Sequence, residues 1–215
     1  MFTGIVESLG RIEAIETVGG DRRLTVLADG SYLDGLQHGD SVAVSGVCLT
    51  AVTLLPRGFT ADVSVETLNA TTAGRWQAGT PVNLERALTP AKPLGGHLMS
   101  GHVDGVGRLV ELRQEARSRR LVFEPPRGIA RYIARKGSVA IDGVSLTVNE
   151  VEPLHRGGRF GVNIIPQTWT HTTLGGLAEG AQVNLEVDLI ARYLERLLSA
   201  RDGRGADQEG EEAPA

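Results

Sequence analysis

The chain has 215 residues, 41% of them hydrophobic and 22% charged, and its single cysteine excludes a disulfide framework or a multi-cysteine metal site. The formal net charge of −4 lies in residues 202–215, which hold five acidic side chains and one arginine, and the neutral remainder lacks the positive field of a nucleic-acid-binding protein. No stretch approaches the roughly 18 apolar residues of a membrane span, and the first residues lack the pattern of a signal peptide, so we expect a cytoplasmic protein that makes no membrane contact.

The sequence contains one unit twice in tandem. The string SVAVSGVCLTAV, which begins at Ser41, matches SVAIDGVSLTVN, which begins at Ser138, at seven of twelve positions and an offset of 97 residues. The same offset aligns FTGIVESLGRI from Phe2 with MSGHVDGVGRL from Met99, and later blocks align at an offset of 101. Four extra residues near Arg156 account for the change, because a hairpin loop can lengthen at little cost. The pattern indicates a duplicated unit of just under 100 residues.

Each unit has the pattern of short β-strands separated by turn residues. In the first unit the runs rich in Val, Thr and Leu are Leu24–Leu27, Ser41–Val44, Thr50–Leu54, Phe59–Val65 and Val82–Glu85. Regularly spaced short strands predict a sandwich or a closed barrel, and closure would leave no exposed edge. Short helical turns are expected at Ser31–Leu36 and Glu66–Gly74 and, in the second unit, at Ile129–Arg135 and Gln167–Gly175.

The hydrophobic period changes after the second unit. Over residues 188–201 apolar residues recur at helical spacing, which predicts an amphipathic helix that either packs on a barrel or joins copies of the chain in a bundle. The apolar stripe comprises Leu189, Ile190, Tyr193, Leu194, Leu197 and Leu198. The expected division is a barrel over residues 1–90, a linker over 91–97, a barrel over 98–187, the helix over 188–201 and a disordered acidic tail over 202–215.

The string GGHLMSGHVDG contains two of the five histidines, His97 and His102. They lie five residues apart with no third ligand, second cysteine or HExxH pattern nearby, which argues against a metal site. His102 is a candidate general base, because an unperturbed histidine titrates near neutral pH. For His97 the spacing favours a structural role in a glycine-rich linker.

Cys48 in GVCLT and Ser145 in GVSLT occupy the same position of the two units. The simplest interpretation is a small residue beside a glycine on a packed strand. GVSLT lacks the GxSxG pattern of a nucleophile elbow, so a serine hydrolase is disfavoured.

Two homologous units imply two similar pockets, and the corresponding loops are polar in both. These polar side chains are Asp62, Glu66, Thr67, Asn163, Gln167 and Thr168. Convergent donors and acceptors suit a polyhydroxylated ligand, and a pair of pockets suits two copies of it. The alternative is a fold built by duplication in which only one pocket is used.

Five strings carry a resemblance to a known family. In chain order they are MFTGIVE, GVCLT, GGHLMSGHVDG, SVAIDGVSLTVNEV and VNLEVDLIARYLERLL. Over residues 1–200 the chain resembles the riboflavin synthase family, of the alpha-chain type with tandem lumazine-binding repeats. The resemblance implies an all-β fold of two tandem six-stranded Greek-key barrels, with a C-terminal amphipathic helix that holds a homotrimer.

The implied reaction is a dismutation, the last step of riboflavin biosynthesis. Two molecules of 6,7-dimethyl-8-ribityllumazine, both bound in one active site, give riboflavin and 5-amino-6-(D-ribitylamino)uracil by transfer of a four-carbon unit. The N-terminal pocket of one chain would face the C-terminal pocket of another. No metal and no redox cofactor is implied, and a lumazine synthase capsid is a further candidate partner.

The resemblance also implies the residues that line each pocket. The N-terminal pocket comprises Gly4, Ile5, Val6, Cys48, Leu49, Thr50, Asp62, Val63, Ser64, Val65, Glu66 and Thr67. The C-terminal pocket comprises Gly101, His102, Val103, Lys136, Ser145, Leu146, Thr147, Asn163, Ile164, Ile165, Pro166, Gln167 and Thr168.

Five residues are candidates for the chemistry. We expect His102 to shuttle protons and Ser145, or a water that it orients, to assist at the C7 position of the lumazine. Cys48 and Thr147 would support them. Asp188 stands at the start of the helix, where it is either a cap or a catalytic carboxylate.

Two other functions compete with the enzyme. A non-catalytic antenna protein that binds lumazine or riboflavin would share the fold but usually keeps only one competent repeat. A purely structural trimeric scaffold would not need polar pocket loops in both halves. Both repeats of this chain retain their pocket strings, which favours the enzyme.

Overall fold

The strands confirm the duplication and its two offsets. The computed structural model describes residues 1–208. The first unit contains β1 (Ser8–Val18), β2 (Asp21–Leu27), α1 (Gly30–Leu33), β3 (Ser41–Val44), β4 (Val47–Thr50), β5 (Thr53–Leu55), β6 (Gly58–Val63), α2 (Val65–Ala70), the 3₁₀ turn η1 (Thr72–Arg75) and β7 (Pro81–Arg86). The second contains β8 (Gly105–Glu115), β9 (Ser118–Glu124), η2 (Ala130–Tyr132), β10 (Ser138–Ile141), β11 (Val144–Val151), η3 (Leu154–Arg156), β12 (Phe160–Ile164), α3 (Pro166–His171), η4 (Thr173–Gly176) and β13 (Gln182–Val187).

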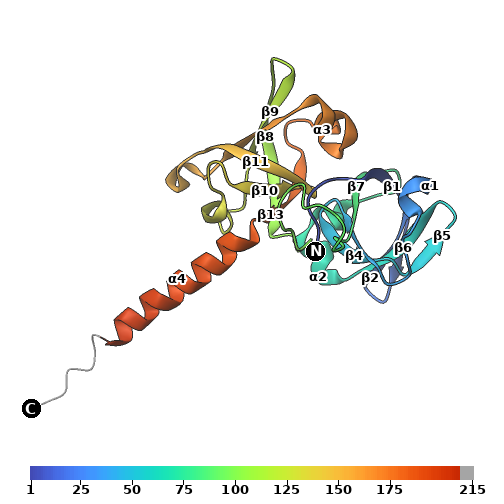
Figure 1. Ribbon diagram of the computed structural model, residues 1–215, viewed down its shortest axis with the longest axis horizontal. Coiled ribbons are helices and arrows are strands. Elements are labelled where there is room, and N and C mark those ends of the chain that lie inside the picture. Colours follow the sequence, from blue (N-terminus) through green and yellow to red (C-terminus); the bar gives the residue numbers. More distant parts are fainter. Residues whose placement is uncertain (209–215) are drawn as a thin grey trace, which may run out of the picture.

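The two units form separate β domains with the predicted barrel architecture (Figure 1). The second is a closed six-stranded barrel in the order β10-β11-β12-β9-β8-β13. The first is a half-barrel, a seven-stranded sheet in the order β4-β3-β7-β1-β2-β6-β5. The difference lies in one strand, because the unbroken β11 pairs with both β10 and β12, whereas its counterpart in the first unit is divided into β4 and β5.

Corresponding apolar residues fill the two cores. Ile12, Leu24 and Leu84 are fully buried in the first domain, and Leu109, Leu121 and Leu185 hold the same places in the second. On β2 the buried Leu24 and Val26 alternate with the partly exposed Thr25, whereas Leu84 on β7 and Leu185 on β13 have buried neighbours on both sides. Truncating such a residue to alanine costs about 2–5 kcal/mol, so each domain has its own stabilising core.

A symmetric set of hydrogen bonds joins the two domains. The side-chain NH₂ group of Asn83 donates to the carbonyl of Asp142 (2.8 Å), and that of Asn184 donates to the carbonyl of Ser45 (2.9 Å). Ser45 and Asp142 each begin a two-residue hairpin turn with positive φ, 44° and 46°. Gly46 completes the first turn, where a Cβ atom would lie only 2.8 Å from the backbone nitrogen of the facing turn. The close backbone contact between the two hairpins therefore fixes the position of one domain relative to the other.

The C-terminal helix differs in length from its prediction. Helix α4 (Leu189–Gln208) begins one residue after the predicted start and continues through the first part of the segment expected to be disordered. Adding a residue to an existing helix costs less than starting one, so a polar sequence can prolong it. The rest of the predicted tail, 209–215, lies outside the described residues. None of the helices in the described part combines the length and apolar character needed to cross a bilayer.

Helix α4 projects away from both domains and is tied to the second by charged contacts near its start (Figure 1). Glu195 accepts hydrogen bonds from Arg131 (2.8 Å) and from the Tyr132 hydroxyl. Arg192 donates to Asp104, whose other oxygen accepts the backbone N–H of Val187 (2.8 Å). These contacts set the direction of the helix, while its apolar stripe stays uncovered.

Several strand predictions need correction. No strand was predicted at β1 or β4, and one strand was predicted over Thr50–Leu54, where the chain in fact leaves β4 and enters β5. The predicted strand Phe59–Val65 ends earlier, at Val63, because Ser64 becomes the N-cap of α2. The helical turns lie where they were predicted: α1 and η2 are shorter than expected, and the other two are each divided into a helix and a 3₁₀ turn.

Candidate functional site

The segments that follow Met1 and Leu98 each lie on the opposite domain. We call residues 2–6 the first crossover segment and residues 99–103 the second crossover segment. The carbonyl of Gly4 accepts the backbone N–H of Ser145 in the second domain (2.8 Å). The carbonyl of Gly101 accepts the backbone N–H of Cys48 in the first domain (2.8 Å). The N-terminus accordingly lies where the two domains meet (Figure 1).

This exchange regroups the predicted pocket residues. Sequence reasoning placed Gly4 and Val6 with Cys48, but the structure brings Gly4 to Ser145, and Val6 packs on the core of the second domain. Conversely, Gly101 lies beside Cys48, and Val103 packs on the core of the first domain. The physical reason is a small apolar cluster between the domains, which is formed by Phe2, Met99, Ala43 and Ala140. Phe2 and Met99 pair there through two backbone hydrogen bonds of 2.8 and 3.1 Å, so each segment continues past the other.

Because side chains alternate along a strand, the predicted pocket residues of β4 and β11 point outward and inward in turn. On β4, Cys48 is half-buried and Thr50 exposed, whereas Leu49 between them points into the core. On β11, Ser145 and Thr147 have the same two exposures, and Leu146 is buried. The two domains therefore offer matching edges, one with a thiol and one with a hydroxyl at the same place.

Among the described residues, Ser145 has a side-chain partner and Cys48 has none. The Ser145 hydroxyl forms a 2.7 Å hydrogen bond with Nδ1 of His97, while Nε2 of His97 is buried and has no partner in the described part of the chain. Burial lowers the pKa of His97, and the negative charges of Asp188 and Glu85 partly oppose this shift. His97 is therefore neutral near pH 7, with one nitrogen facing the Ser145 hydroxyl.

Sequence reasoning did not predict the contact between His97 and Ser145. The spacing favoured a structural role for His97 and a chemical role for His102, and both roles stay predictions. In the structure His102 is exposed, and its backbone N–H donates to the Ser100 hydroxyl (3.1 Å). The available signal was the shared string, because His97 lies two residues before the second crossover segment and therefore near the domain boundary.

Asp188 was predicted to be either a helix cap or a catalytic carboxylate. Its carboxylate accepts the backbone N–H of Ile190 (3.0 Å), as a residue that caps the start of α4 does. Its charge also acts on His97 and raises the pKa of that ring against the effect of burial. The cap is thus present in the structure, and the catalytic role stays a prediction.

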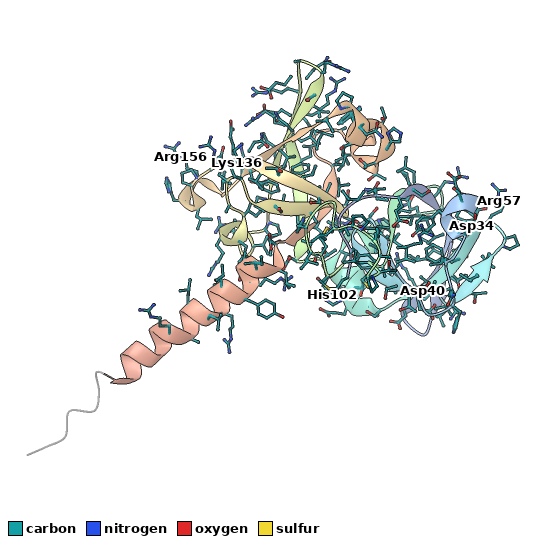
Figure 2. The ribbon with its side chains drawn as sticks, viewed as in Figure 1. Asp34, Asp40, Arg57, His102, Lys136 and Arg156 are labelled. Carbon is teal, nitrogen blue, oxygen red and sulfur yellow. The ribbon has the colours of Figure 1, made fainter. Side chains whose placement is uncertain are left out.

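Lys136 occupies a strained turn in the second domain. Its φ is 68°, in the left-handed region that disfavours side chains, and its N–H donates to the carbonyl of Val148 (2.7 Å). The equivalent residue of the first domain is Gly39, with φ 89° and the corresponding bond to Ala51 (2.8 Å). Glycine meets this backbone requirement without strain, so a lysine here is typical of a functional position. Figure 2 shows Lys136 and His102 well apart.

The polar side chains of the two domains differ in how many of their hydrogen-bonding atoms have a partner. Arg23 forms two hydrogen bonds with Asp62, of 2.7 and 2.8 Å, and thereby lowers the pKa of that carboxyl. Ser64 accepts the N–H of Thr67 (3.3 Å) and caps α2. In the second domain, the side-chain NH₂ group of Asn163 donates to Glu115 (3.3 Å), but its buried oxygen has no protein partner.

The remaining loop residues of the second domain are open to a ligand. The residue before α3 is Ile165, which is exposed and provides no side-chain cap, and Pro166 is the first residue of the helix. Gln167 is exposed. The loop thus offers polar and apolar groups side by side.

Two of the larger cavities border the predicted pockets without containing their central residues. A cavity of about 840 Å³ lies between α2 and the start of β8, and Val65 and Asp104 are among the residues that line it. A cavity of about 610 Å³ lies on the second domain and is lined by charged side chains such as Arg120 and Glu150. Neither is lined by Cys48, Ser145 or His102, of which the first two are half-buried and the third is exposed.

Comparison with known proteins gives a consistent result. A family model described as the lumazine binding domain matches the chain twice, at residues 3–87 and 100–188. The riboflavin synthase of Photobacterium phosphoreum is 44% identical over 198 residues, which cover 92% of this chain and 89% of that protein. The riboflavin synthase of Mycobacterium bovis is 46% identical over 199 residues, which cover 92% of this chain and 98% of that protein.

Solved structures share the fold at lower sequence identity. LumP complexed with riboflavin has a TM-score of 0.79 and 25% identity, covering 87% of this chain and 99% of its own. LumP complexed with 6,7-dimethyl-8-(1'-D-ribityl) lumazine has a TM-score of 0.77 and 24% identity over the same shares. The duplicated barrels, the two matching edges and the two family matches thus agree.

Proposed function

The chain belongs to the riboflavin synthase family, and on that premise we propose that it converts two molecules of 6,7-dimethyl-8-ribityllumazine into riboflavin and 5-amino-6-(D-ribitylamino)uracil. It is an enzyme, a transferase that moves a four-carbon unit from one lumazine to the other. The observation that carries this function is 44–46% identity to riboflavin synthases over 92% of the chain, with both lumazine-binding repeats matched.

The reaction needs two copies of one molecule in contact, and two related pockets meet that need. A proton leaves the C7 methyl group of one lumazine, whose ring system stabilises the carbanion, and the carbanion attacks the second lumazine. Holding the two rings in register provides effective molarities of about 10⁵ M or more. The site therefore does not need a strongly activated catalytic group.

We assign the proton-transfer role to the second domain. Neutral His97 accepts or donates a proton at Nδ1, where it contacts the Ser145 hydroxyl (2.7 Å). His102, the exposed residue of the second crossover segment, is placed to reach a lumazine bound on the first domain beside Cys48. The polar groups of Asp62, Asn163 and their neighbouring loops would bind the ribityl hydroxyls.

The active site is completed by a second chain. Helix α4 exposes its apolar stripe, with Leu197 68% accessible. The exposed members of the stripe are Ile190, Tyr193, Leu194, Leu197 and Leu198. We propose that three helices cover these stripes in a homotrimer, which places the N-terminal pocket of one chain opposite the C-terminal pocket of the next.

An antenna protein is the second candidate function, and it is less well supported. The LumP structures share the fold, but their sequence identity is 24–25%, well below that of the synthases. Both crossover segments keep the same hydrogen bond to the opposite domain, so neither pocket has lost this feature. A cytoplasmic location and association with a lumazine synthase stay predictions, and co-purification with a lumazine synthase would test the latter.

One assay tests the function directly. The pure protein is incubated with 6,7-dimethyl-8-ribityllumazine, and riboflavin formation is followed by absorbance. We expect one riboflavin for every two lumazines consumed, together with one equivalent of 5-amino-6-(D-ribitylamino)uracil. Lumazine binding without turnover would instead support the antenna protein.

A further inference from the structure

Two buried glutamates hold the crossover segments at their turning points. Glu85 on β7 and Glu186 on β13 are equivalent residues of the two units, and they are 2% and 4% exposed. Glu85 accepts the Thr3 N–H (2.8 Å), the Thr3 hydroxyl (2.6 Å) and the Gly4 N–H (2.9 Å). Glu186 accepts the corresponding three groups of Ser100 and Gly101, at 2.6, 2.7 and 3.0 Å.

The held residues are those that touch the opposite pocket edge. Gly4, whose N–H binds Glu85, accepts the Ser145 N–H through its carbonyl, and Gly101, whose N–H binds Glu186, accepts the Cys48 N–H. Both glycines have positive φ, 77° and 79°. A Cβ atom at Gly4 would lie 2.5 Å from Ser145, and one at Gly101 would lie 2.7 Å from Cys48. A displacement of either segment is therefore passed directly to the pocket edge.

We propose that Glu85 and Glu186 are positioning residues for the reaction, each of which sets the pocket of the opposite domain. Glu186 of the second domain fixes the second crossover segment against Cys48 of the first. Glu85 of the first domain fixes the first crossover segment against Ser145 of the second. This inference rests on the proposed role of Cys48 and Ser145 as pocket edges.

The chemistry of the contacts suits this role. Hydrogen bonds to a carboxylate are roughly twice as strong as neutral ones, and three on one group define the position of two consecutive residues. A buried carboxylate is costly unless its oxygens are satisfied, so the segment cannot leave without a large loss. The environments are otherwise different, because Lys92 lies 3.2 Å from Glu85, whereas Glu186 has no basic partner among the described residues. The three-donor arrangement is thus retained in both units although the surrounding charges have changed.

Cys48 provides a readout that a general loss of stability would not produce. It is the only cysteine of the chain and is half-buried beside Gly101. We expect Glu186→Gln to loosen the second crossover segment and to increase the rate of Cys48 alkylation by a maleimide about tenfold, the effect of losing one hydrogen bond to a charged group. Glu85→Gln is the matched control, and its alkylation rate should equal that of the native protein because its segment lies on Ser145. Both variants should lower kcat for riboflavin formation more than they change KM.

Thermal unfolding of both variants shows whether they fold. If Glu186→Gln does not, Ser100→Ala removes one donor to Glu186, and Thr3→Val removes the equivalent donor to Glu85. Faster alkylation in Ser100→Ala but not in Thr3→Val supports the proposal. Equal alkylation rates in the two members of a pair would overturn it. Because alkylation needs neither lumazine nor turnover, its failure is distinguishable from failure of the proposed function.

Discussion

The two domains began as copies, and their differences show where each is specialised. The second closes its barrel with one unbroken strand, β11, while the first interrupts that strand between β4 and β5. At the interruption the N–H of Ala51 still donates to the carbonyl of Asp40, just before β3 (2.9 Å), and that of Val52 donates to Thr60 on β6 (2.8 Å). The break therefore costs few hydrogen bonds, and the duplicated fold tolerates an open seam in one copy.

The ionisable groups differ more than the backbone does. The second domain has Lys136 where the first has Gly39, and Asp142 where the first has Ser45. It also pairs Ser145 with His97, whereas no hydrogen bond to a side chain is found for the thiol of Cys48 among the described residues. The second domain therefore carries a lysine, an aspartate and a serine–histidine pair at places where the first domain has a glycine, a serine and a lone thiol. The predictions below test this difference.

The largest expected effect comes from separating the chains, so that the N-terminal pocket of one chain no longer lies opposite the C-terminal pocket of another. Deleting residues 189–215 removes α4 and should leave a monomer whose riboflavin formation falls at least about 1000-fold, because the two lumazines are no longer held together. Sedimentation velocity gives the mass and the lumazine assay gives the rate. A chain that ends at Gln208 is the control and should keep its assembly and turnover. A fully active monomer would show that one chain contains a complete site.

Sequence reasoning predicted the features that depend on local pattern. The offset of 97 residues and the helix stripe through Leu194 could be predicted from spacing, whereas spacing left a sandwich or a barrel open and the family resemblance implied the two barrels. The crossing of the two segments could not, because it depends on Phe2 meeting Met99 nearly 100 residues away, and no local pattern encodes that pairing. The contact of His97 with Ser145 could not be predicted for the same reason, since the two residues lie 48 positions apart in the chain.

The next prediction compares the two pocket edges directly. Ser145→Ala removes the hydroxyl that contacts His97, and we expect kcat to fall about 100-fold, the lower end of the effects of general acid–base groups. Cys48→Ala removes a thiol that makes no such contact and should lower kcat less than tenfold. Steady-state kinetics on both variants, with folding checked by circular dichroism, measure the ratio. Equal losses would show that the two domains contribute alike to proton transfer.

The domain boundary should respond to pH because of Asp142. Burial raises the pKa of Asp142 to about 7, which the hydrogen bond from the Asn184 N–H only partly offsets. The folded state then keeps a proton that the unfolded chain releases above about pH 4. Stability from this group is therefore present at low pH and is lost as the pH rises towards 7, by up to about 4 kcal/mol.

Replacing Asp142 by the residue of the other copy tests this directly. In Asp142→Ser the new hydroxyl should accept the Asn184 N–H as Ser45 accepts that of Asn83 (3.1 Å). We expect the melting temperature of the native protein to fall between pH 4 and 7 more steeply than that of the variant. Parallel curves for the two proteins, measured by calorimetry, would contradict the assignment to Asp142.

The smallest expected effect concerns the exposed pair Arg23 and Asp62. Asp62→Asn gives the first loop the residue that the second loop has at Asn163, and an exposed ion pair contributes little to stability. The arginine lowers the pKa of Asp62, so the small stabilisation is present above the usual aspartate pKa and is lost as the pH falls through the lowered value. We therefore expect nearly equal melting temperatures at pH 7 and a still smaller difference below the lowered pKa, with a several-fold higher KM for lumazine because an NH₂ group replaces a carboxylate oxygen that accepts hydrogen bonds. An unchanged KM would mean that Asp62 serves only Arg23, and that the two polar loops differ in function as well as in charge.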